Sequence, residues 1–388
     1  MIHQFGFVSE ETFSEKMDTQ NRFLAALVTA QGGALKPTSW AEIQALVRAG
    51  LHKNVFSIGD QLVCQKGSSS ITWDVIGIDH DTPADSQFTH SLTLQLHDCL
   101  SSQMQVDAPE ALYYAENGLS AGTYHFTIQG SYTPIGGTSK TYCFTLASDI
   151  PAGGQLTFGW AYNTQAGNAK ITSYGADLTT VIESDISVTE GSSGTSLGTT
   201  DGNSTNLNFI EKARFGSNNY SESAIRQFLN SNNSAGSVWT PQTNFDRPPT
   251  WANNTAGFMF DLDSDFLAVI GKVNKLTALN SITDGGGSVT LDDKFFLLSR
   301  SEVYGGLENN INEGSPYPYY KDYSSLSETG TGSDSNRIKY RNGSAQSWYL
   351  RTHFSNSVGN IRNVNSDGGI NSAGTYSNSG IAPACVII

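Results

Sequence analysis

Charged side chains are scarce in this chain. Lys, Arg, Asp and Glu make up 15% of its 388 residues, whereas an ordinary globular domain has about 25%. The charge that is present is mainly negative, with a formal net charge of −14. Proteins that bind nucleic acid or anionic membranes need a basic face, so this composition argues against both kinds of partner.

Long apolar runs are missing as well. No stretch reaches the roughly 18 consecutive apolar residues of a membrane span. The N-terminus has no basic region followed by an apolar run, so no signal peptide is expected. The four cysteines lie far apart without metal-ligand spacing, so we expect buried thiols and no metal site. The length exceeds the roughly 250–300 residues that one core organises, which predicts two or three domains.

The order of patterns along the chain predicts an α+β protein. Residues 1–56 have helical spacing, and Ser39 with Glu42 forms a capping box before the second helix. After this segment, short strands separated by turns predominate. The predicted organisation is a helical N-terminal segment at 1–56, the first part of a C-terminal domain at 57–116, a small inserted β-sandwich at 117–205, and the main part of that domain at 206–388.

The helical segment 1–56 is too short to hold a core of its own. We expect it to serve assembly or oligomerisation by packing on the next domain or on a second copy, and both possibilities stay open. Further helices are predicted at 221–229 and from about 264 to 273, and a strand at 294–298.

Three short motifs invite a chemical interpretation but have a simpler one. The run 79–81 (Asp-His-Asp) contains metal-ligand types, yet it follows an apolar strand where such residues cap turns. The run 97–99 (His-Asp-Cys) contains nucleophile and base types, yet neighbours in a strand point to opposite faces. The acids of 261–265 lack the glycine and glutamate of a calcium loop and suit a helix N-terminus. We therefore expect no catalytic residue, no cofactor and no metal.

The most informative segment lies near the C-terminus. Asn, Ser and Gly account for 17 of the 26 residues from 355 to 380, which alone is typical of a disordered tail. Aliphatic residues interrupt this segment, and it lies between Trp348-Tyr349 and a strongly apolar run at 381–388. Because both flanks are expected to be buried, we predict an ordered, surface-displayed array of short strands and loops. Small polar side chains on such a scaffold suit adaptable hydrogen bonding.

Five motifs occur in the chain: WDVIGIDHD at 73–81, YSESAIRQFLN at 220–230, FFLLSRSEV at 295–303, WYLR at 348–351 and GIAPA at 380–384. They resemble the motifs of a bacterial and phage domain family with a C-type-lectin-like fold, related to the formylglycine-generating enzyme. The resemblance covers about 57–115 and 206–388, with 117–205 as an insertion. It implies scaffold roles for Ile225, Arg226, Leu229, Trp348, Leu350, Arg351 and Pro383.

Many members of that family resemble the variable proteins of diversity-generating retroelements, in which error-prone reverse transcription at template adenines rewrites codons near the 3′ end of a gene. Asparagine codons are the main targets, and 352–379 has the residue set that results. The resemblance implies a variable region at about 348–388, on a receptor-binding protein of a phage tail or cell surface that is not an enzyme. Its expected ligand-binding residues are Thr352, His353, Phe354, Asn356, Asn360, Arg362, Asn363, Asn365, Asp367, Asn371, Tyr376 and Asn378. By residue type, Phe354, Arg362 and Tyr376 are the expected hot spots.

The expected partner is a protein or glycan on a target cell, with neither nucleic-acid binding nor membrane insertion. Because single sites of this kind bind weakly, a homo-oligomer, with a trimer as the candidate, would add avidity. Two alternatives stay open. An enzyme related to the formylglycine-generating fold would need a cleft around His80, His97 or Cys99, although no cysteine matches the oxygen-activating pair of that enzyme. The other alternative is a structural virion or adhesin subunit without a specific ligand.

Overall fold

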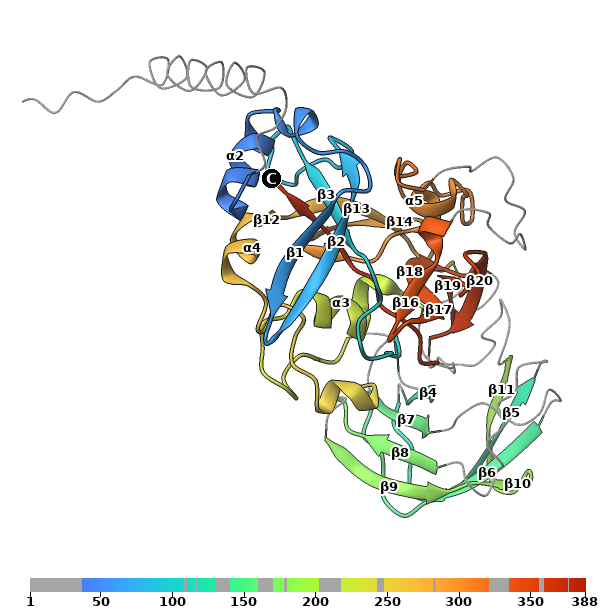
Figure 1. Cartoon of the computed structure of the whole chain (residues 1–388). Helices are drawn as coiled ribbons and strands as arrows, with labels where there is room; N and C mark the ends of the chain where they lie inside the picture. The colour runs from blue at the N-terminus through green and yellow to red at the C-terminus, as the bar shows by residue number, and fades with distance from the viewer. Residues whose placement is uncertain are drawn as a thin grey trace, which may run out of the picture.

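One sheet organises the larger part of the molecule, which is mixed α+β with mostly strands (Figure 1). The computed structural model describes residues 37–107, 110–115, 117–129, 140–159, 170–177, 180–201, 218–242, 248–281, 284–320, 335–355, 359–375 and 377–388. The six strands of the main sheet follow the order β1-β2-β3-β21-β12, with β15 also paired to β21. They are β1 (Gln61–Lys66), β2 (Ser69–Ile78), β3 (Leu92–Leu96), β12 (Ile270–Gly271), β15 (Phe295–Phe296) and β21 (Ala384–Ile387).

Strand β21 lies inside this sheet and is buried on both faces. Cys385 and Ile387 belong to one hydrophobic cluster, whereas Ala384 and Val386 belong to another. This division follows from the two-residue period of a strand, whose side chains alternate between faces. A strand covered on both faces needs apolar residues at every position, which explains the uninterrupted apolar run at 381–388.

Short helices pack against one face of the sheet: α2 (Trp40–Arg48), α3 (Ala224–Leu229) and α4 (Ser264–Val269). Their N-caps are Ser39, Ser223 and Asp263, and each side chain accepts a backbone N–H of the first turn. The interpretation of the 261–265 acids as a helix start is thus confirmed. The predicted extension of α4 to residue 273 is wrong, because Ile270 pairs with Ile387 and begins β12.

The described part of the helical N-terminal segment packs on the main domain. The Trp40 and Phe266 rings lie 4.6 Å apart between centroids, and Gln44 donates from Nε2 to the Ile388 carbonyl at 2.7 Å. The first predicted helix of that segment lies outside the described residues. Among the residues that are described, no helix has both the length and the apolar character needed to span a bilayer.

The other face of the sheet packs against α5 (Arg300–Tyr304) and a three-stranded sheet of order β18-β19-β20. The strands of that smaller sheet are β18 (Trp348–His353), β19 (Asn360–Val364) and β20 (Ile370–Gly374). Two hairpins complete this part: β13 (Val273–Ala278) with β14 (Ser288–Asp293), and β16 (Lys339–Arg341) with β17 (Ser344–Gln346). Its 3₁₀ turns are η1 (His52–Asn54), η3 (Tyr220–Glu222), η4 (Thr250–Asn253) and η5 (Ser335–Arg337).

The remaining strands form two four-stranded sheets, of orders β4-β7-β8-β9 and β10-β6-β5-β11. They are β4 (Glu110–Ala115), β5 (Gly122–Gln129), β6 (Lys140–Leu146), β7 (Gly154–Gly159), β8 (Lys170–Tyr174), β9 (Val181–Ser187), β10 (Thr189–Glu190) and β11 (Thr195–Asp201). Both sheets contribute to one hydrophobic cluster, to which Phe126, Leu156 and Ile186 belong. This sandwich begins at Glu110, earlier than the predicted 117, because β4 pairs with β7.

Candidate ligand-binding face

A buried ion cluster fixes β18 to the core. Arg351 donates from Nη1 to Glu302 at 2.6 Å and from Nη2 to the Glu313 carbonyl at 2.7 Å. Lys275 donates to the second oxygen of Glu302 at 2.8 Å. Burial alone would raise the pKa of Glu302, but the charges of Arg351 and Lys275 outweigh it and lower this pKa to about 2. One ionised carboxylate therefore ties α5, β13 and β18 together.

A second buried acid fixes β19. Glu308 accepts from Arg362 Nε at 2.7 Å, from Arg300 Nη1 at 3.0 Å and from the Ser355 N–H at 2.9 Å. The Arg362 guanidinium also lies 4.5 Å from the centre of the Phe354 ring. Arg362, an expected hot spot, is therefore engaged inside the molecule and is only 6% exposed.

Other residues of the predicted variable set are buried as well. Thr352 donates its hydroxyl to Glu313, and burial lowers the pKa of His353, which lies against Asn309. The prediction of surface display is wrong for Thr352, His353, Arg362 and Asn363. The reason is that β18 and most of β19 are covered on both faces.

The acids that hold these strands were missed in the sequence. One signal was available: Ser299 and Glu302 have the spacing of a capping box, and each side chain accepts the other's backbone N–H at the start of α5. The local sequence does not mark Glu308 or Glu313 as the acids that hold β19 and β18, because Arg362 lies 54 residues after Glu308 and Thr352 lies 39 residues after Glu313.

Four predicted residues do reach the surface, three of them on the β19–β20 hairpin and the fourth between β20 and β21. Asp367, Asn371 and Asn378 are exposed and Asn365 is half-buried, and we call these four the exposed polar set. Asn371 donates to the Asn365 side-chain oxygen at 3.3 Å. The turn between the strands is closed by a bond from the Asn365 N–H to the Gly369 carbonyl at 2.7 Å.

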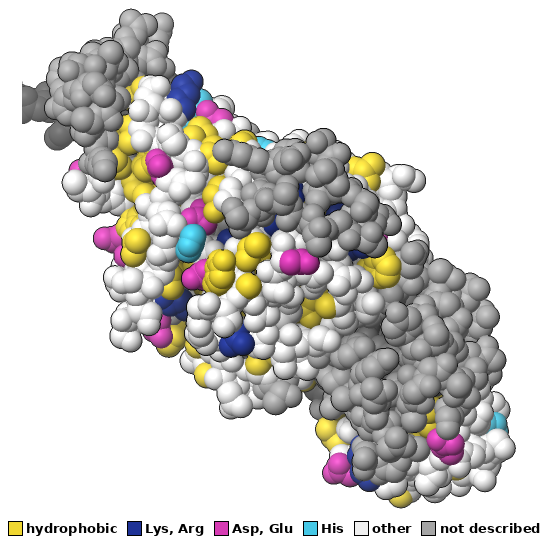
Figure 2. Space-filling model, turned by 45° about the vertical axis from the view of Figure 1, so that its right-hand side comes forward, with side chains coloured by type: hydrophobic (Ala, Val, Ile, Leu, Met, Phe, Trp, Pro, Cys, Tyr) yellow, Lys and Arg dark blue, Asp and Glu magenta, His cyan; other side chains and the backbone are white. Residues whose placement is uncertain are grey.

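The rest of the predicted set lies at the opposite end of β19 or outside the described residues. Phe354 and Asn360 are half-buried, whereas Asn356 and Tyr376 lie outside the described residues. Figure 2 shows one face of the molecule, where charged side chains are few among uncharged ones. The surface thus reflects the low charge content of the chain.

The residues assigned to the scaffold lie within the packed interior or close to it. Ile225, Leu229, Trp348, Leu350 and Arg351 are fully buried, and so is Pro383 by burial class. Arg226 is half-buried, and its Nε and Nη2 both donate to the Asp293 carboxylate, at 2.8 and 2.9 Å. That two-pronged pair fixes α3 to β14.

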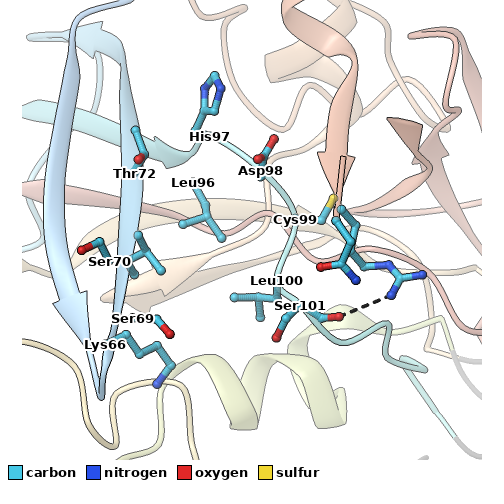
Figure 3. Close-up of a pocket in the computed structure, with 13 residues that line it drawn as sticks. Lys66, Ser69, Ser70, Thr72, Leu96, His97, Asp98, Cys99, Leu100 and Ser101 are labelled. Carbon is cyan, nitrogen blue, oxygen red and sulfur yellow. Dashed lines mark hydrogen bonds between the residues drawn. The ribbon is translucent and has the colours of Figure 1, made fainter. Parts of the chain in front are cut away.

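A pocket of about 490 Å³ opens where β2 and β3 part (Figure 3). We call it the split-sheet pocket, and it is lined by Lys66, 69–72, 96–101, Arg341 and Asn342. Its wall adjoins the segment predicted to be variable, because the N–H groups of Leu100 and Met104 donate to the carbonyls of Ile381 and Ser379, each at 2.9 Å.

The pocket includes two of the three residues at which a cleft would favour an enzyme. His97 Nδ1 lies 2.9 Å from the Asp74 carboxylate, which also accepts from the Tyr319 hydroxyl at 2.9 Å. Burial raises the pKa of Cys99 to about 12, the opposite of what a nucleophilic thiol needs. Figure 3 shows the His97 ring pointing away from Cys99. Within the described residues, these two side chains do not form a nucleophile–base pair.

The three side chains of the run 79–81 do not converge on one site, because each makes a different contact. Asp79 accepts from His90 at 3.1 Å, His80 packs on the Tyr317 ring at 4.2 Å, and Asp81 accepts from the Tyr317 hydroxyl at 2.9 Å. In the part of the chain that the structure describes, no group of three or more His, Cys, Asp or Glu side chains is arranged to hold a metal ion.

Comparison with known proteins places the C-terminal half in a family. Residues 182–388, more than half of the chain, match the family described as "Domain of unknown function (DUF6273)". The chain belongs to the DUF6273 family. No curated protein matches it, and no solved structure does. The DUF6273 match begins inside β9 and contains the exposed polar set, whereas β1, β2 and β3 join the same sheet as β21 from outside the match.

Proposed function

We propose that this DUF6273 protein binds a protein or glycan on a target cell surface and is not an enzyme. The observation that carries the proposal is the position of the exposed polar set: Asn365, Asp367 and Asn371 lie on a hairpin held by the buried Glu308–Arg362 pair, and Asn378 follows that hairpin. Side chains on a rigidly held hairpin can change without loss of the core. Short amide and carboxylate side chains also adapt their hydrogen bonds to varied partners.

We further propose a C-type-lectin-like fold for the domain and a place among the variable proteins of diversity-generating retroelements, in a phage tail or on a cell surface. The motifs at 220–230, 295–303, 348–351 and 380–384 support this proposal, because all four lie within the matched region and contribute to adjoining cores. Assembly into a homo-oligomer such as a trimer would add avidity.

Binding by the exposed polar set is tested by exchanging its residues in the full chain. A variant carrying Asn365→Tyr, Asp367→Ser, Asn371→Tyr and Asn378→Ser is compared with the wild type on a glycan array and on a panel of bacterial cells. We expect a changed set of targets. The control is Asn232→Tyr, at an exposed position on the loop after α3, which should bind as the wild type does. Identical targets for the fourfold variant and the wild type would overturn the proposal.

Diversification is tested in the genome. We expect a near-copy of the 3′ end of the gene beside a reverse-transcriptase gene, with differences confined to adenines. Codons of the exposed polar set should be among the differing ones. A neighbourhood without such a copy would remove the diversification proposal and leave the binding experiment to decide the rest.

A second candidate function is hydrolysis at the split-sheet pocket. It is favoured by the contact between His97 and the Asp74 carboxylate, since a histidine oriented in this way can serve as a general base toward water. The test is turnover of a panel of aryl esters by the wild type and by His97→Gln. Turnover that disappears in His97→Gln would establish this candidate and contradict the proposal that the protein is not an enzyme.

A further inference from the structure

Strand β2 is longer than the strand beside it. The last bond between β2 and the β3 side runs from the His97 N–H to the Thr72 carbonyl at 2.9 Å. Toward its N-terminal end, β2 continues from Thr72 back to Ser69, and residues 69–71 pair with β1 alone. Within the described residues, the first part of β2, from Ser69 to Ile71, therefore has an unpaired edge, and this edge faces the split-sheet pocket (Figure 3).

The chain after His97 leaves β2 because it is bonded elsewhere. The Cys99 N–H donates to the Tyr340 carbonyl at 2.9 Å, and the Leu100 N–H donates to the Ile381 carbonyl at 2.9 Å. These bonds fix the far wall of the pocket against β16 and the chain before β21. The gap is therefore a built part of the fold, and β3 cannot extend further along β2 without breaking both bonds.

Ser70 directs its backbone groups into this gap. Successive residues of an antiparallel strand bond alternately to one neighbour and the other, and the Thr72 carbonyl points to the β3 side, so Ser70 points there too. Gln65, opposite Ser70 on β1, gives independent support, since its carbonyl accepts from the Asp263 N–H at 2.9 Å on the outer side of β1. Among the described residues, nothing bonds the Ser70 N–H or carbonyl on the pocket side.

The pocket also has a positive balance in an acidic chain. Lys66 and Arg341 line it, and Asp98 is the one acidic side chain among the described lining residues. Arg341 is half-buried and donates from Nη1 to the Ser101 carbonyl at 3.4 Å, which places its charge beside the wall formed by 99–101. The whole chain, in contrast, has a formal net charge of −14. An acidic group entering the pocket would meet Arg341 favourably.

We propose that the split-sheet pocket binds an extended, acidic peptide segment of a partner protein, which adds as a strand beside β2. The peptide main chain would exchange hydrogen bonds with Ser70, and an acidic side chain would contact Arg341. An unpaired strand edge offers a donor and an acceptor at the spacing of a polypeptide backbone, which is how strand addition obtains affinity. The site is separate from the exposed polar set and goes beyond the function proposed above.

The test uses the full chain and an array of synthetic eight-residue peptides in which Val or Thr alternates with Glu, Lys or Gln. We expect binding confined to the Glu peptides, with the best binder then titrated by fluorescence anisotropy. Ser70→Pro removes the N–H that faces the pocket and spares the β1–β2 ladder, so it should weaken binding about tenfold. The matched control is Val63→Pro. Val63 pairs with Thr72, is 54% exposed and directs its N–H away from β2, so its variant should bind as the wild type does.

A second variant tests the charge without touching the backbone. Arg341→Glu should weaken the Glu peptides and allow the Lys peptides to bind. The proposal is overturned if no peptide of the array binds, if Ser70→Pro binds like Val63→Pro, or if Arg341→Glu leaves the preference unchanged. All of these variants keep the exposed polar set intact, so a failure here is distinguishable from a failure of the binding face on the β19–β20 hairpin.

Discussion

The guanidinium of Arg351 and the carboxylate of Glu302 lie 2.6 Å apart, with side chains that are 0% and 3% exposed. Lys275 contacts the same carboxylate and is 4% exposed. Lys275 also pairs with Asp81, whose side chain is 6% exposed, so four charges are enclosed beside the sheet that ends in the proposed binding hairpin. Removing one charge from such a cluster is strongly destabilising, because its partners then stay buried without water and without an opposite charge.

Removing the acid should therefore destabilise the protein strongly. Glu302→Gln removes the carboxylate that Arg351 and Lys275 share and leaves Lys275 with Asp81 alone. We expect a loss of about 3–5 kcal/mol in the free energy of unfolding, mainly because the fully buried Arg351 loses its ion pair. The measurement is chemical denaturation of the full chain, with the unfolding transition monitored by tryptophan fluorescence.

The control for this loss is an exposed pair. Lys272 and Asp292 lie 2.9 Å apart with side chains 57% and 60% exposed, so Asp292→Asn should cost less than about 1 kcal/mol. A Glu302→Gln variant as stable as Asp292→Asn would mean that the buried cluster does not hold β18.

Glu302 also predicts how stability depends on pH. Its pKa in the folded protein, about 2, is lower than its ordinary value of 4.5. A lowered carboxyl pKa stabilises the fold above the ordinary value, and this stabilisation is lost as the pH falls through the folded value. The difference in unfolding free energy between wild type and Glu302→Gln should therefore shrink between about pH 4.5 and 2. Glu313 acts in the opposite direction, because burial raises its pKa, but it is common to both proteins. A difference that stays constant over this range would contradict the assignment.

Substitutions between 352 and 379 should fall into two classes. The fourfold variant of the exposed polar set should melt within about 2 °C of the wild type, because substitutions at open surface positions usually change stability by less than about 0.5 kcal/mol. Arg362→Ala removes one of the two arginines paired with Glu308 and should lower the melting temperature clearly. Differential scanning calorimetry separates the two classes. Equal effects would show that the hairpin tip is as tightly coupled to the core as its base.

The sandwich should unfold as a unit of its own. Its hydrophobic cluster contains residues from 115 to 197 alone and shares none with the two clusters around the main sheet. Leu156→Ala should lower one unfolding transition and Phe296→Ala the other, each by about 2–5 kcal/mol. Calorimetry of the full chain measures both transitions. A single transition that both variants shift equally would show that the two parts unfold together.

Thiol labelling should separate the four cysteines. Burial raises the pKa of Cys64 to about 11 and that of Cys99 to about 12, and it raises the pKa of Cys385 well above the usual range. Cys143 is half-buried on the sandwich. We expect Cys143 to react rapidly in the native protein, because the reactive species is an accessible thiolate. The other three cysteines should react only after unfolding. Mass spectrometry of the labelled peptides identifies the site, and rapid labelling of Cys99 would contradict the burial of the pocket wall.

Local patterns in the sequence were sufficient to predict some features. Ser39 and Asp263 mark helix starts through capping, and 381–388 is apolar throughout because β21 is covered on both faces. Which polar residues of 352–379 face solvent could not be read in this way. Arg362 and Asn371 occur in similar surroundings in the sequence, and only the pairing with Glu308, 54 residues before Arg362, turns one of them inward. The split-sheet pocket could not be predicted from local patterns either, because it forms where β2 and β3 stop pairing, and strand pairing is a long-range property.

The position of β21 inside the main sheet also has a consequence for folding. Gln95 on β3 and Ala382, just before β21, are hydrogen-bonded across 287 residues of sequence, so the sheet closes only by joining very distant parts of the chain. Contacts of such long range form slowly, and until β21 docks, the edge of β3 is open to pairing with other molecules. The hairpin with the exposed polar set lies immediately before this closing strand. A variant that delayed the docking of β21 would therefore be lost to aggregation even if its final structure were stable, so the speed of assembly, and not stability alone, limits which substitutions this hairpin tolerates.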